Sequence, residues 1–242
     1  MKENVGDAKR LSLTGNQLKI IAMVAMFLGH LALAFDPRNG VVIAFGRMAF
    51  PIFAYMIAEG CRYTKNRAKY LGLIAALAAL MQIGGYIINR SLEMSILISF
   101  SLAIVAIFSF DVILLDKRIG RKLLAIFPLA LVALVIFVLP IYLKDSGFYI
   151  VYGPLGVLLP VAIYYSDGKV QKLLSATIIL ALIARTTGYF QQWYSLMAIP
   201  LLALYNGKRG KLKMKYFFYV FYPLQRLIIM AIEYALAYFS MK

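Results

Sequence analysis

The order of apolar and polar residues divides this chain into long hydrophobic runs separated by short polar connections. A helix that crosses a bilayer needs about 20 mostly apolar residues, and fewer where polar ends are tolerated. Nine runs meet that criterion, at residues 18–35, 41–60, 71–88, 93–115, 123–143, 148–165, 173–187, 189–205 and 216–240. The pattern predicts an all-α, polytopic transmembrane bundle of about nine spans, in which residues 1–242 form one domain and residues 1–17 a tail.

Two features make the later spans unusual. The seventh and eighth runs are short and are joined only at Thr187 and Gly188, so they are two spans, two half-helices or a re-entrant pair. The sixth run carries helix-breaking residues, which predict a kinked or broken helix. These residues are Gly153, Pro154, Gly156 and Pro160.

Basic residues accumulate on alternate connections, as the positive-inside rule requires. Nineteen of the 26 Lys and Arg residues lie in the amino-terminal tail or follow spans two, four, six and eight, whereas five lie on the other side. Among the nineteen are Lys19, Lys65, Lys117 and Lys213. The distribution predicts a cytoplasmic amino terminus and a carboxyl terminus on the opposite face.

The composition agrees with a membrane protein, because 63% hydrophobic and 15% charged residues give too little polar surface for a soluble globule of 242 residues. The net charge of +16 concentrates on the predicted cytoplasmic face and suits anionic headgroups or a phosphorylated ligand. Nucleic acid is not expected, since no basic groove of useful length lies outside the bilayer. The single cysteine, Cys61, excludes an internal disulfide and provides no metal cluster, so no metal is expected.

Several polar side chains lie deep within the apolar runs. His30, the only histidine, and Arg47 are costly at such depth, which makes them candidates for function. The helical rise places Gln82, Gln225 and Arg226 in the same slab of the membrane. The nearest acids do not join them, and Glu59 has an expected partner in Arg62, three residues on.

Two arginines without a close carboxylate predict a cavity for an anionic or carbonyl-bearing ligand, because a buried unpaired charge is expensive. Alternatively, Arg47 and Arg226 cap backbone carbonyls or extend toward the membrane surface. A nearby cation disfavours the imidazolium form of His30. The neutral ring is the form that acts as a general base or as a nucleophile toward a thioester, although a packing role is the alternative.

Longer motifs resemble a known family. The runs LTGNQLKIIAMVAMFLGHLAL, GRMAFPIFAYMIAEGCRYTKNRAKY, YNGKRG and KYFFYVFYPL resemble the TraX family of bacterial membrane proteins, whose namesake acetylates the amino terminus of F pilin. The resemblance implies a polytopic acetyltransferase of the bacterial plasma (inner) membrane that uses acetyl-CoA. The matching positions are His30, Arg47, Glu59, Gln82, Tyr152, Gly153, Asn206 and Lys208.

Three positions depart from the family pattern. Relatives usually have Asp where this chain has Gly29, Asp two residues before Gly153, where it has Val151, and His where it has Gln225. Loss of these groups removes partners for His30 and Arg47. It leaves open a changed substrate or a relative that binds without turnover.

The resemblance favours transfer of an acetyl group from acetyl-CoA to an amine or hydroxyl acceptor, which is a peptide such as a pilin amino terminus, a sugar or a lipid. His30 is the expected base or acetyl carrier, and Arg47 or Gln82 would stabilise the oxyanion. Further substrate or cofactor contacts are expected from Glu59, Tyr152, Asn206, Gln225 and Arg226. The donor phosphates would lie near Arg62, Lys65, Arg67, Lys208 and Arg209. The alternatives are a transporter for a small anion and a non-catalytic relative such as an immunity or assembly factor.

Overall fold

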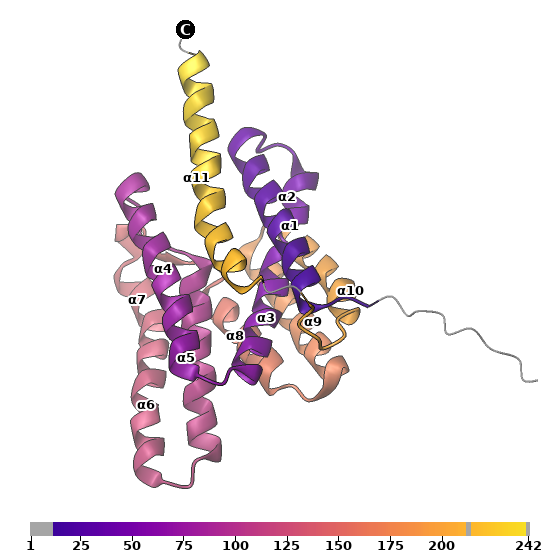
Figure 1. Cartoon of the computed structure of the whole chain (residues 1–242). Helices are drawn as coiled ribbons and strands as arrows, with labels where there is room; N and C mark the ends of the chain where they lie inside the picture. Colours follow the sequence, from indigo (N-terminus) through magenta and orange to yellow (C-terminus); the bar gives the residue numbers. More distant parts are fainter. Residues whose placement is uncertain (1–11, 212–213, 241–242) are drawn as a thin grey trace, which may run out of the picture.

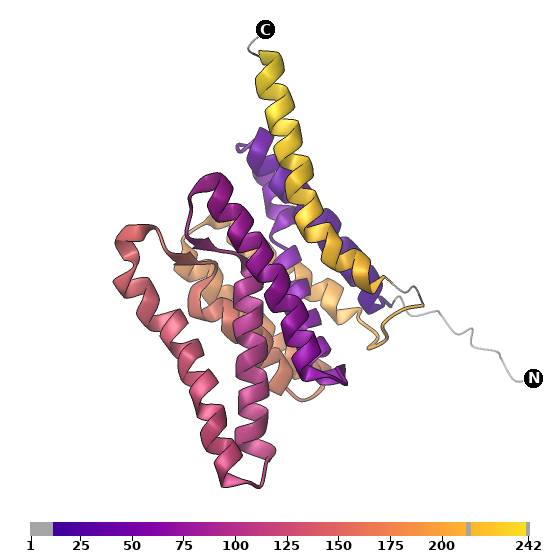
Figure 2. The ribbon, with the colours of Figure 1, turned by 60° about the vertical axis from the view of Figure 1, so that its left-hand side comes forward.

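The computed structural model describes residues 12–211 and 214–240, and it is helical almost throughout (Figures 1 and 2). Most of the predicted tail, together with Lys213 and Lys242, therefore lies outside the described residues. The helices are α1 (Gly15–Phe35), α2 (Gly40–Gly46), α3 (Ala49–Tyr63), α4 (Arg67–Asn89), α5 (Ile96–Leu115), α6 (Ile119–Ala133), α7 (Leu139–Tyr142), α8 (Gly153–Tyr165), α9 (Gly168–Thr187), α10 (Ala198–Ala203) and α11 (Lys215–Ser240).

Shorter elements connect them. A π-helical turn, Leu134–Val138, joins α6 to α7, and two 3₁₀ helices cover Lys144–Ser146 and Phe190–Met197. Two short strands, β1 (Glu93–Met94) and β2 (Tyr149–Ile150), pair in parallel, with Glu93 opposite Tyr149.

The helical membrane class is confirmed, but the count of nine spans is not. Within the described residues, six segments are long and apolar enough to cross a membrane. They are Gly15–Phe35, Gly40–Tyr63, Arg67–Ile88, Ile96–Leu115, Ile119–Tyr142 and Gly168–Thr187. The eighth predicted run instead divides into the 3₁₀ helix Phe190–Met197 and the six-residue α10, because the chain does not keep one helical geometry through it.

The sixth predicted run is also not one helix. Its first residues form β2, and the chain then turns through Tyr152 and Gly153, which have φ angles of 61° and 51°. These left-handed values are incompatible with a continuous right-handed helix. The helix that follows, α8, has 13 residues, or about 20 Å of rise, which is short of a hydrocarbon core of roughly 30 Å. The predicted break in this run is therefore confirmed.

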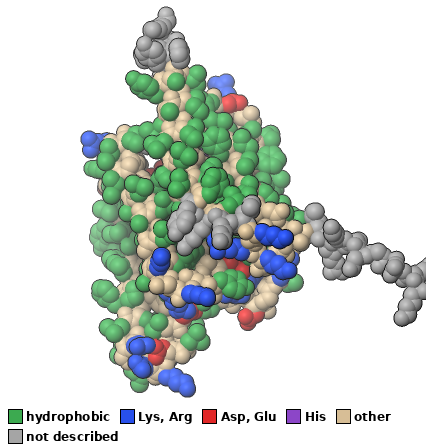
Figure 3. Space-filling view, in the orientation of Figure 1, with side chains coloured by type: hydrophobic (Ala, Val, Ile, Leu, Met, Phe, Trp, Pro, Cys, Tyr) green, Lys and Arg blue, Asp and Glu red, His purple; other side chains and the backbone are tan. Residues whose placement is uncertain are grey.

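The core of the bundle lies where α1, α3, α5, α8 and α9 pack together. Ile52 of α3, Ile107 of α5 and Leu159 of α8 are completely buried there. By contrast, α6 presents large apolar side chains outward, among them Phe127, which is 76% exposed. Green side chains cover most of the molecule in Figure 3, as expected for a surface that faces lipid.

Basic side chains gather over the lower helix ends in Figure 3 and are sparse at the top. Contacts between segments far apart in sequence bring these ends together. Arg62 at the end of α3 donates to the carbonyl of Tyr164 near the end of α8, and Lys169 Nζ donates to the Tyr205 carbonyl at 3.1 Å. We call this end, which collects the connections after α3, α5, α8 and α10, the basic end; its cytoplasmic location remains a prediction.

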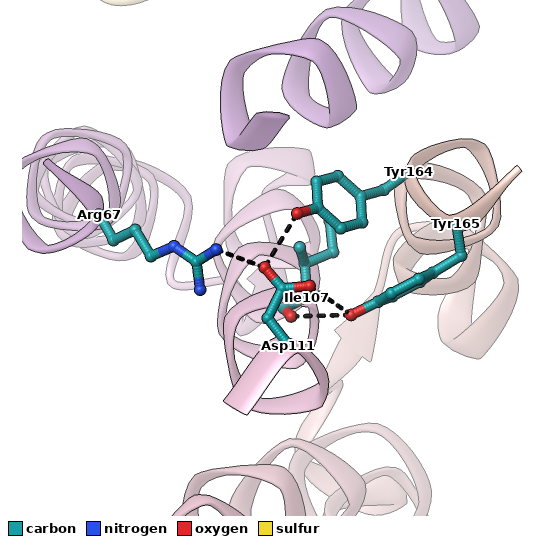
Figure 4. A network of polar contacts seen from close by, with 5 residues as sticks. All are labelled: Arg67, Ile107, Asp111, Tyr164 and Tyr165. Carbon is teal, nitrogen blue, oxygen red and sulfur yellow. Dashed lines mark hydrogen bonds and ion pairs between the residues drawn. The ribbon is translucent and has the colours of Figure 1, made fainter. Parts of the chain in front are cut away.

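A buried carboxylate joins three helices at the basic end (Figure 4). Asp111 of α5 forms an ion pair with Arg67 of α4 and accepts hydrogen bonds from the hydroxyls of Tyr164 and Tyr165 at 2.9 and 3.0 Å. The Tyr165 hydroxyl also contacts the Ile107 carbonyl, at 3.1 Å. Because Asp111 is only 4% exposed, these partners offset its desolvation. Arg67, which was expected to lie near the donor phosphates, instead forms this ion pair between α4 and α5.

Candidate functional site

One large cavity, of about 1190 Å³, lies between α1, α3, α4 and α11. It runs from the basic end, where Lys19 and Arg209 line it, toward the opposite ends of α1 and α4, where Leu33 and Ile88 line it. Four of the predicted site residues lie between these ends: His30, Arg47, Gln82 and Arg226. The residues that the helical rise predicts at one depth thus line one cavity.

A single stripe of α1 forms one wall of this cavity. Its residues recur at intervals of four and three, which places them on one face of a helix. They are Lys19, Met23, Met26, His30 and Leu33. Lys19 and His30, eleven residues apart, are therefore separated by about 17 Å along the helix axis.

Two glycines set the position of the central side chains. A Cβ atom on Gly29 of α1 would lie 2.7 Å from the Cα atom of Gly46 of α2, so the two backbones touch. Small residues allow such close helix crossings in membranes. His30 and Arg47 follow these glycines directly in the sequence. The backbone contact therefore carries both residues to the same part of the cavity.

Gln225 of α11 contacts the imidazole. Its Nε2 lies 3.4 Å from His30 Nδ1, and the side chain is 1% exposed. The Gln225 Oε1 atom is buried without a hydrogen-bond partner. Rotating the amide by half a turn would place Oε1 against Nδ1, where it accepts the Nδ1 proton and leaves the Nε2 lone pair for chemistry. Gln225, which stands where relatives usually have His, thus still contacts His30.

Arg47 and Arg226 both lie near the same ring. Both guanidinium groups lie within electrostatic range of His30. Arg47 Nε is buried without a hydrogen-bond partner. Across residues 12–211 and 214–240, neither arginine lies within ion-pair distance of a carboxylate. The cavity therefore carries uncompensated positive charge around its only histidine, an arrangement suited to an anion or a developing oxyanion.

Gln82 and Tyr152 also line the cavity, but each is held by the fold. Gln82 Nε2 donates to the Glu93 carbonyl at 3.1 Å, and its Oε1 accepts from the Ser95 N–H at 3.2 Å. The ring of Tyr152 stacks on Phe50 with centroids 4.3 Å apart. Gln82 consequently has fewer free hydrogen-bonding positions for an oxyanion than Arg47 has.

The expected pairing of Glu59 with Arg62 is wrong. Glu59 Oε1 accepts from Lys172 Nζ of α9 at 2.7 Å, and both residues are 7% exposed. Arg62 points to α8 instead, where its guanidinium also lies over the Tyr164 ring. Proximity along one helix predicted the local pair, but Glu59 is buried, and the tertiary structure places a buried lysine of another helix close enough to compensate its charge.

The YNGKRG segment wraps around the start of α1. The carbonyls of Lys208 and Arg209 accept from the N–H groups of Gly15 and Asn16, at 2.8 and 3.0 Å. Asn206 Oδ1 accepts the Lys208 N–H at 2.9 Å and stabilises the turn. The loop carbonyls therefore occupy the N–H groups of Gly15 and Asn16, so these two donors at the start of α1 are not available to a ligand.

Only one of the two predicted loop cations lines the cavity. Arg209 does so, whereas Lys208 and Asn206 do not. Lys19 of α1 also lines the cavity and lies within electrostatic range of Arg209. Sequence reasoning counted Lys19 only as an orientation charge. The four-and-three spacing from Lys19 to His30 was the signal that pointed to their common face.

Comparison with known proteins agrees with the motif analysis. A family model described as "TraX protein" matches residues 14–233. A probable fimbrial assembly protein FimC, serogroup H1, of Dichelobacter nodosus is 27% identical over 234 residues, which cover 89% of this chain and 94% of that protein. No solved structure matches the chain.

Proposed function

This chain belongs to the TraX family, and from that premise we propose that it is an acetyltransferase of the bacterial inner membrane. Acetyl-CoA is the proposed donor, and the acceptor is an amine or a hydroxyl, such as a peptide amino terminus. The described residues and the comparisons support a helical membrane protein of this family. The chemistry proposed below rests on the geometry of the cavity.

The observation that carries the proposal is the placement of Lys19 and His30 on one wall of one cavity. They lie about 17 Å apart along α1. Coenzyme A separates its phosphates from its thiol by an extended pantetheine arm of comparable length. With the phosphates at Lys19 and Arg209, the thioester would reach the imidazole of His30.

His30 is the proposed base. Its Nε2 would take a proton from the acceptor as the acceptor nitrogen or oxygen attacks the thioester carbon. The carbon–sulfur bond then breaks, and the same proton passes to the departing thiolate, so that CoA-SH leaves. For a hydroxyl acceptor these two proton transfers balance the reaction. An acceptor that starts as an ammonium first releases one proton to water. Transfer through a transient acetyl-histidine is the second route open to this residue.

Arg47 is the proposed oxyanion-stabilising group. Negative charge develops on the carbonyl oxygen in acyl transfer, and preorganised donors in a site away from water stabilise it strongly. Arg47 has a buried donor without a partner, and Arg226 adds a second positive charge on the opposite wall. The hydrogen bonds of Gln82 to the backbone of residues 93 and 95 make it the weaker candidate.

A transporter for a small anion is the second candidate. The uncompensated arginines and the broken segment before α8 favour it, since transporters bind substrates beside interrupted helices near the membrane midplane. A non-catalytic relative is the third, because Gly29, Val151 and Gln225 depart from the family pattern.

Thiol release from acetyl-CoA by the purified protein separates these functions. The acetyltransferase proposal requires release that depends on an added amine or hydroxyl acceptor and falls by about 10² to 10⁴-fold in His30→Gln, the loss typical of a general base. The Gln variant keeps hydrogen bonding but does not take up a proton near neutral pH. Near-normal turnover in this variant would remove His30 from the mechanism. Anion uptake into vesicles without thiol release would favour the transporter.

A further inference from the structure

The cavity continues past His30, away from the basic end. On α1, Leu33 follows His30 toward the end of the helix. On α11, Leu227 and Met230 follow Gln225, which contacts the imidazole. We call this part of the cavity the distal compartment and define it by six uncharged lining residues. They are Leu33, Gly84, Gly85, Ile88, Leu227 and Met230.

Two adjacent glycines keep the α4 wall of the distal compartment open. The cavity-lining residues of α4 recur at intervals of three and four, and after Met81 this face continues at Gly84 and Gly85. A Cβ atom added at either glycine would meet no atom within 4 Å. Glycine weakens a helix interior relative to alanine. The helix therefore omits side chains at the positions where it borders the compartment, and the space beside it stays empty.

The charged groups of the central cavity lie before this compartment. Arg47 and Arg226 lie near His30. Gln82 donates to the carbonyl of Glu93 before α4 reaches the two glycines. Beyond these residues the defining walls offer aliphatic side chains and helical backbone whose hydrogen bonds are made within the helix. Such walls suit an apolar chain and do not suit an ion.

The length of the distal compartment follows from its two longest walls, α4 and α11, which diverge away from the basic end (Figure 2). From Gln82 to Ile88 there are six residues, and from Gln225 to Met230 there are five. These intervals correspond to about 9 and 8 Å of helical rise. A fully extended chain advances about 1.2 Å per bond, so about seven bonds fit beyond the level of His30.

The proposed position of the donor directs its acyl group into this space. The thioester carbon at His30 carries the sulfur and the pantetheine arm, which lead back to Lys19, and the acyl group leaves the carbon on another side. An acetyl group adds one methyl there. A longer aliphatic group would contact Leu227 and Met230 and remove its own methylenes from water, which favours binding.

We propose that the distal compartment binds the acyl chain of a thioester donor of about eight carbons, so that the protein transfers acyl groups longer than acetyl. This inference rests on the proposed acyl transfer at His30 and names the donor class. The bonds are those of acetyl transfer. The carbon–sulfur bond breaks, a bond from the same carbon to the acceptor nitrogen or oxygen forms, and the acceptor proton passes to the departing thiolate. Only the length of the transferred chain differs.

Binding measured without an acceptor tests the distal compartment independently of turnover. Acetyl-CoA and octanoyl-CoA are titrated calorimetrically into the purified full chain. We expect octanoyl-CoA to bind about 10-fold or more tightly, because its additional methylenes are buried. Gly84→Leu should lose most of this preference while it keeps its affinity for acetyl-CoA. Gly72→Leu is the matched control, since Gly72 also lies in α4 with open space around it but does not line the cavity.

A second variant tests the compartment from the opposite wall. Met230→Ala enlarges the space at its far end, so we expect the acyl chain with the highest kcat/KM to become longer by one or two methylenes, about the length of the deleted side chain. Thiol release from thioesters of increasing chain length measures this change. The melting temperature of each variant in detergent shows that it is folded. An unchanged chain-length profile in both folded variants, Gly84→Leu and Met230→Ala, would overturn the proposal.

Equal affinity of the wild-type chain for the two thioesters would also overturn the acyl site and would favour a membrane lipid in the compartment. An equal loss of preference in Gly72→Leu would have the same consequence for the acyl site. Thiol release from acetyl-CoA but not from octanoyl-CoA would reject the longer donor and leave the acetyltransferase function intact. A preference for octanoyl-CoA that Gly84→Leu removes, without thiol release from either thioester, would instead reject acyl transfer and leave the binding site standing.

Discussion

Gly29 and Gly46 meet backbone to backbone, and this contact places the residues that follow them, His30 and Arg47, in one cavity. A Cβ atom at residue 29 would lie 2.7 Å from Gly46 Cα, a separation that real Cβ atoms do not adopt. The contact also explains one departure from the family pattern, since an aspartate at residue 29 has no room in this helix crossing.

Gly29→Asp is therefore expected to damage the protein although it introduces the family's usual residue. The added atoms must separate α1 from α2, which costs about 1–3 kcal/mol as overpacking, and a shift of about 1 Å at His30 lowers turnover by up to about 10²-fold. Melting temperature and kcat measure the two effects. Gly72→Ala is the control, because a Cβ there meets no atom within 4 Å. Higher activity in Gly29→Asp would contradict the crossing as described.

Lys19→Ala and Arg209→Ala are each expected to raise the KM for acetyl-CoA several-fold with little change in kcat, because they remove binding that the ground and transition states share. Lys208→Ala is the matched control, since Lys208 belongs to the same loop but does not line the cavity. Steady-state kinetics with varied acetyl-CoA measures the difference. An equal rise in KM for Lys208→Ala would show that loop charge alone attracts the donor.

Glu59→Gln is expected to destabilise the bundle, because it leaves Lys172 charged, buried and without its ion-pair partner. Breaking a buried pair from one side costs about 3–5 kcal/mol, whereas replacing both partners with apolar residues is often close to neutral. Thermal unfolding in detergent of Glu59→Gln and of Glu59→Leu with Lys172→Met tests this contrast. Asp116→Asn, at an exposed ion pair with Arg121, should leave the melting temperature almost unchanged, because solvent screens such pairs.

Gln225→Leu is expected to lower kcat by up to about 10²-fold. Leucine fills a similar volume but removes the hydrogen bond that orients His30. Gln225→His should retain much of the activity, since its ring still offers a hydrogen-bonding nitrogen. A pH profile of kcat separates orientation from packing, because only an altered imidazole changes its midpoint. Equal loss of activity in both variants without a change in the profile would favour packing.

The orientation predicted from basic residues is tested by introduced cysteines. A cysteine at Lys117, between α5 and α6, should be shielded from an impermeant thiol reagent in intact cells, and one at Asp145 should be labelled. The native Cys61 is 3% exposed and gives little background. Labelling in the reverse pattern would place the basic end outside the cytoplasm.

The sequence alone determined the class of the molecule and the depth of its central polar residues. Backbone groups in lipid must be satisfied within the segment, so long apolar runs become helices whatever packs beside them. A constant rise per residue then fixes depth, which is why His30, Arg47 and Arg226 were predicted to lie together. The break before Gly153 followed equally from local backbone preferences.

The tertiary structure decided which groups face one another. Depth says nothing about the direction in which a side chain points or about partners distant in sequence, so Glu59 was assigned to Arg62 although it binds Lys172, 113 residues away. For the same reason the sequence did not indicate that Lys19 faces the cavity or that Gln82 is hydrogen-bonded to the backbone. Long-range pairing of β1 with β2 likewise made the first residues of the sixth apolar run a strand, which the local break alone did not predict.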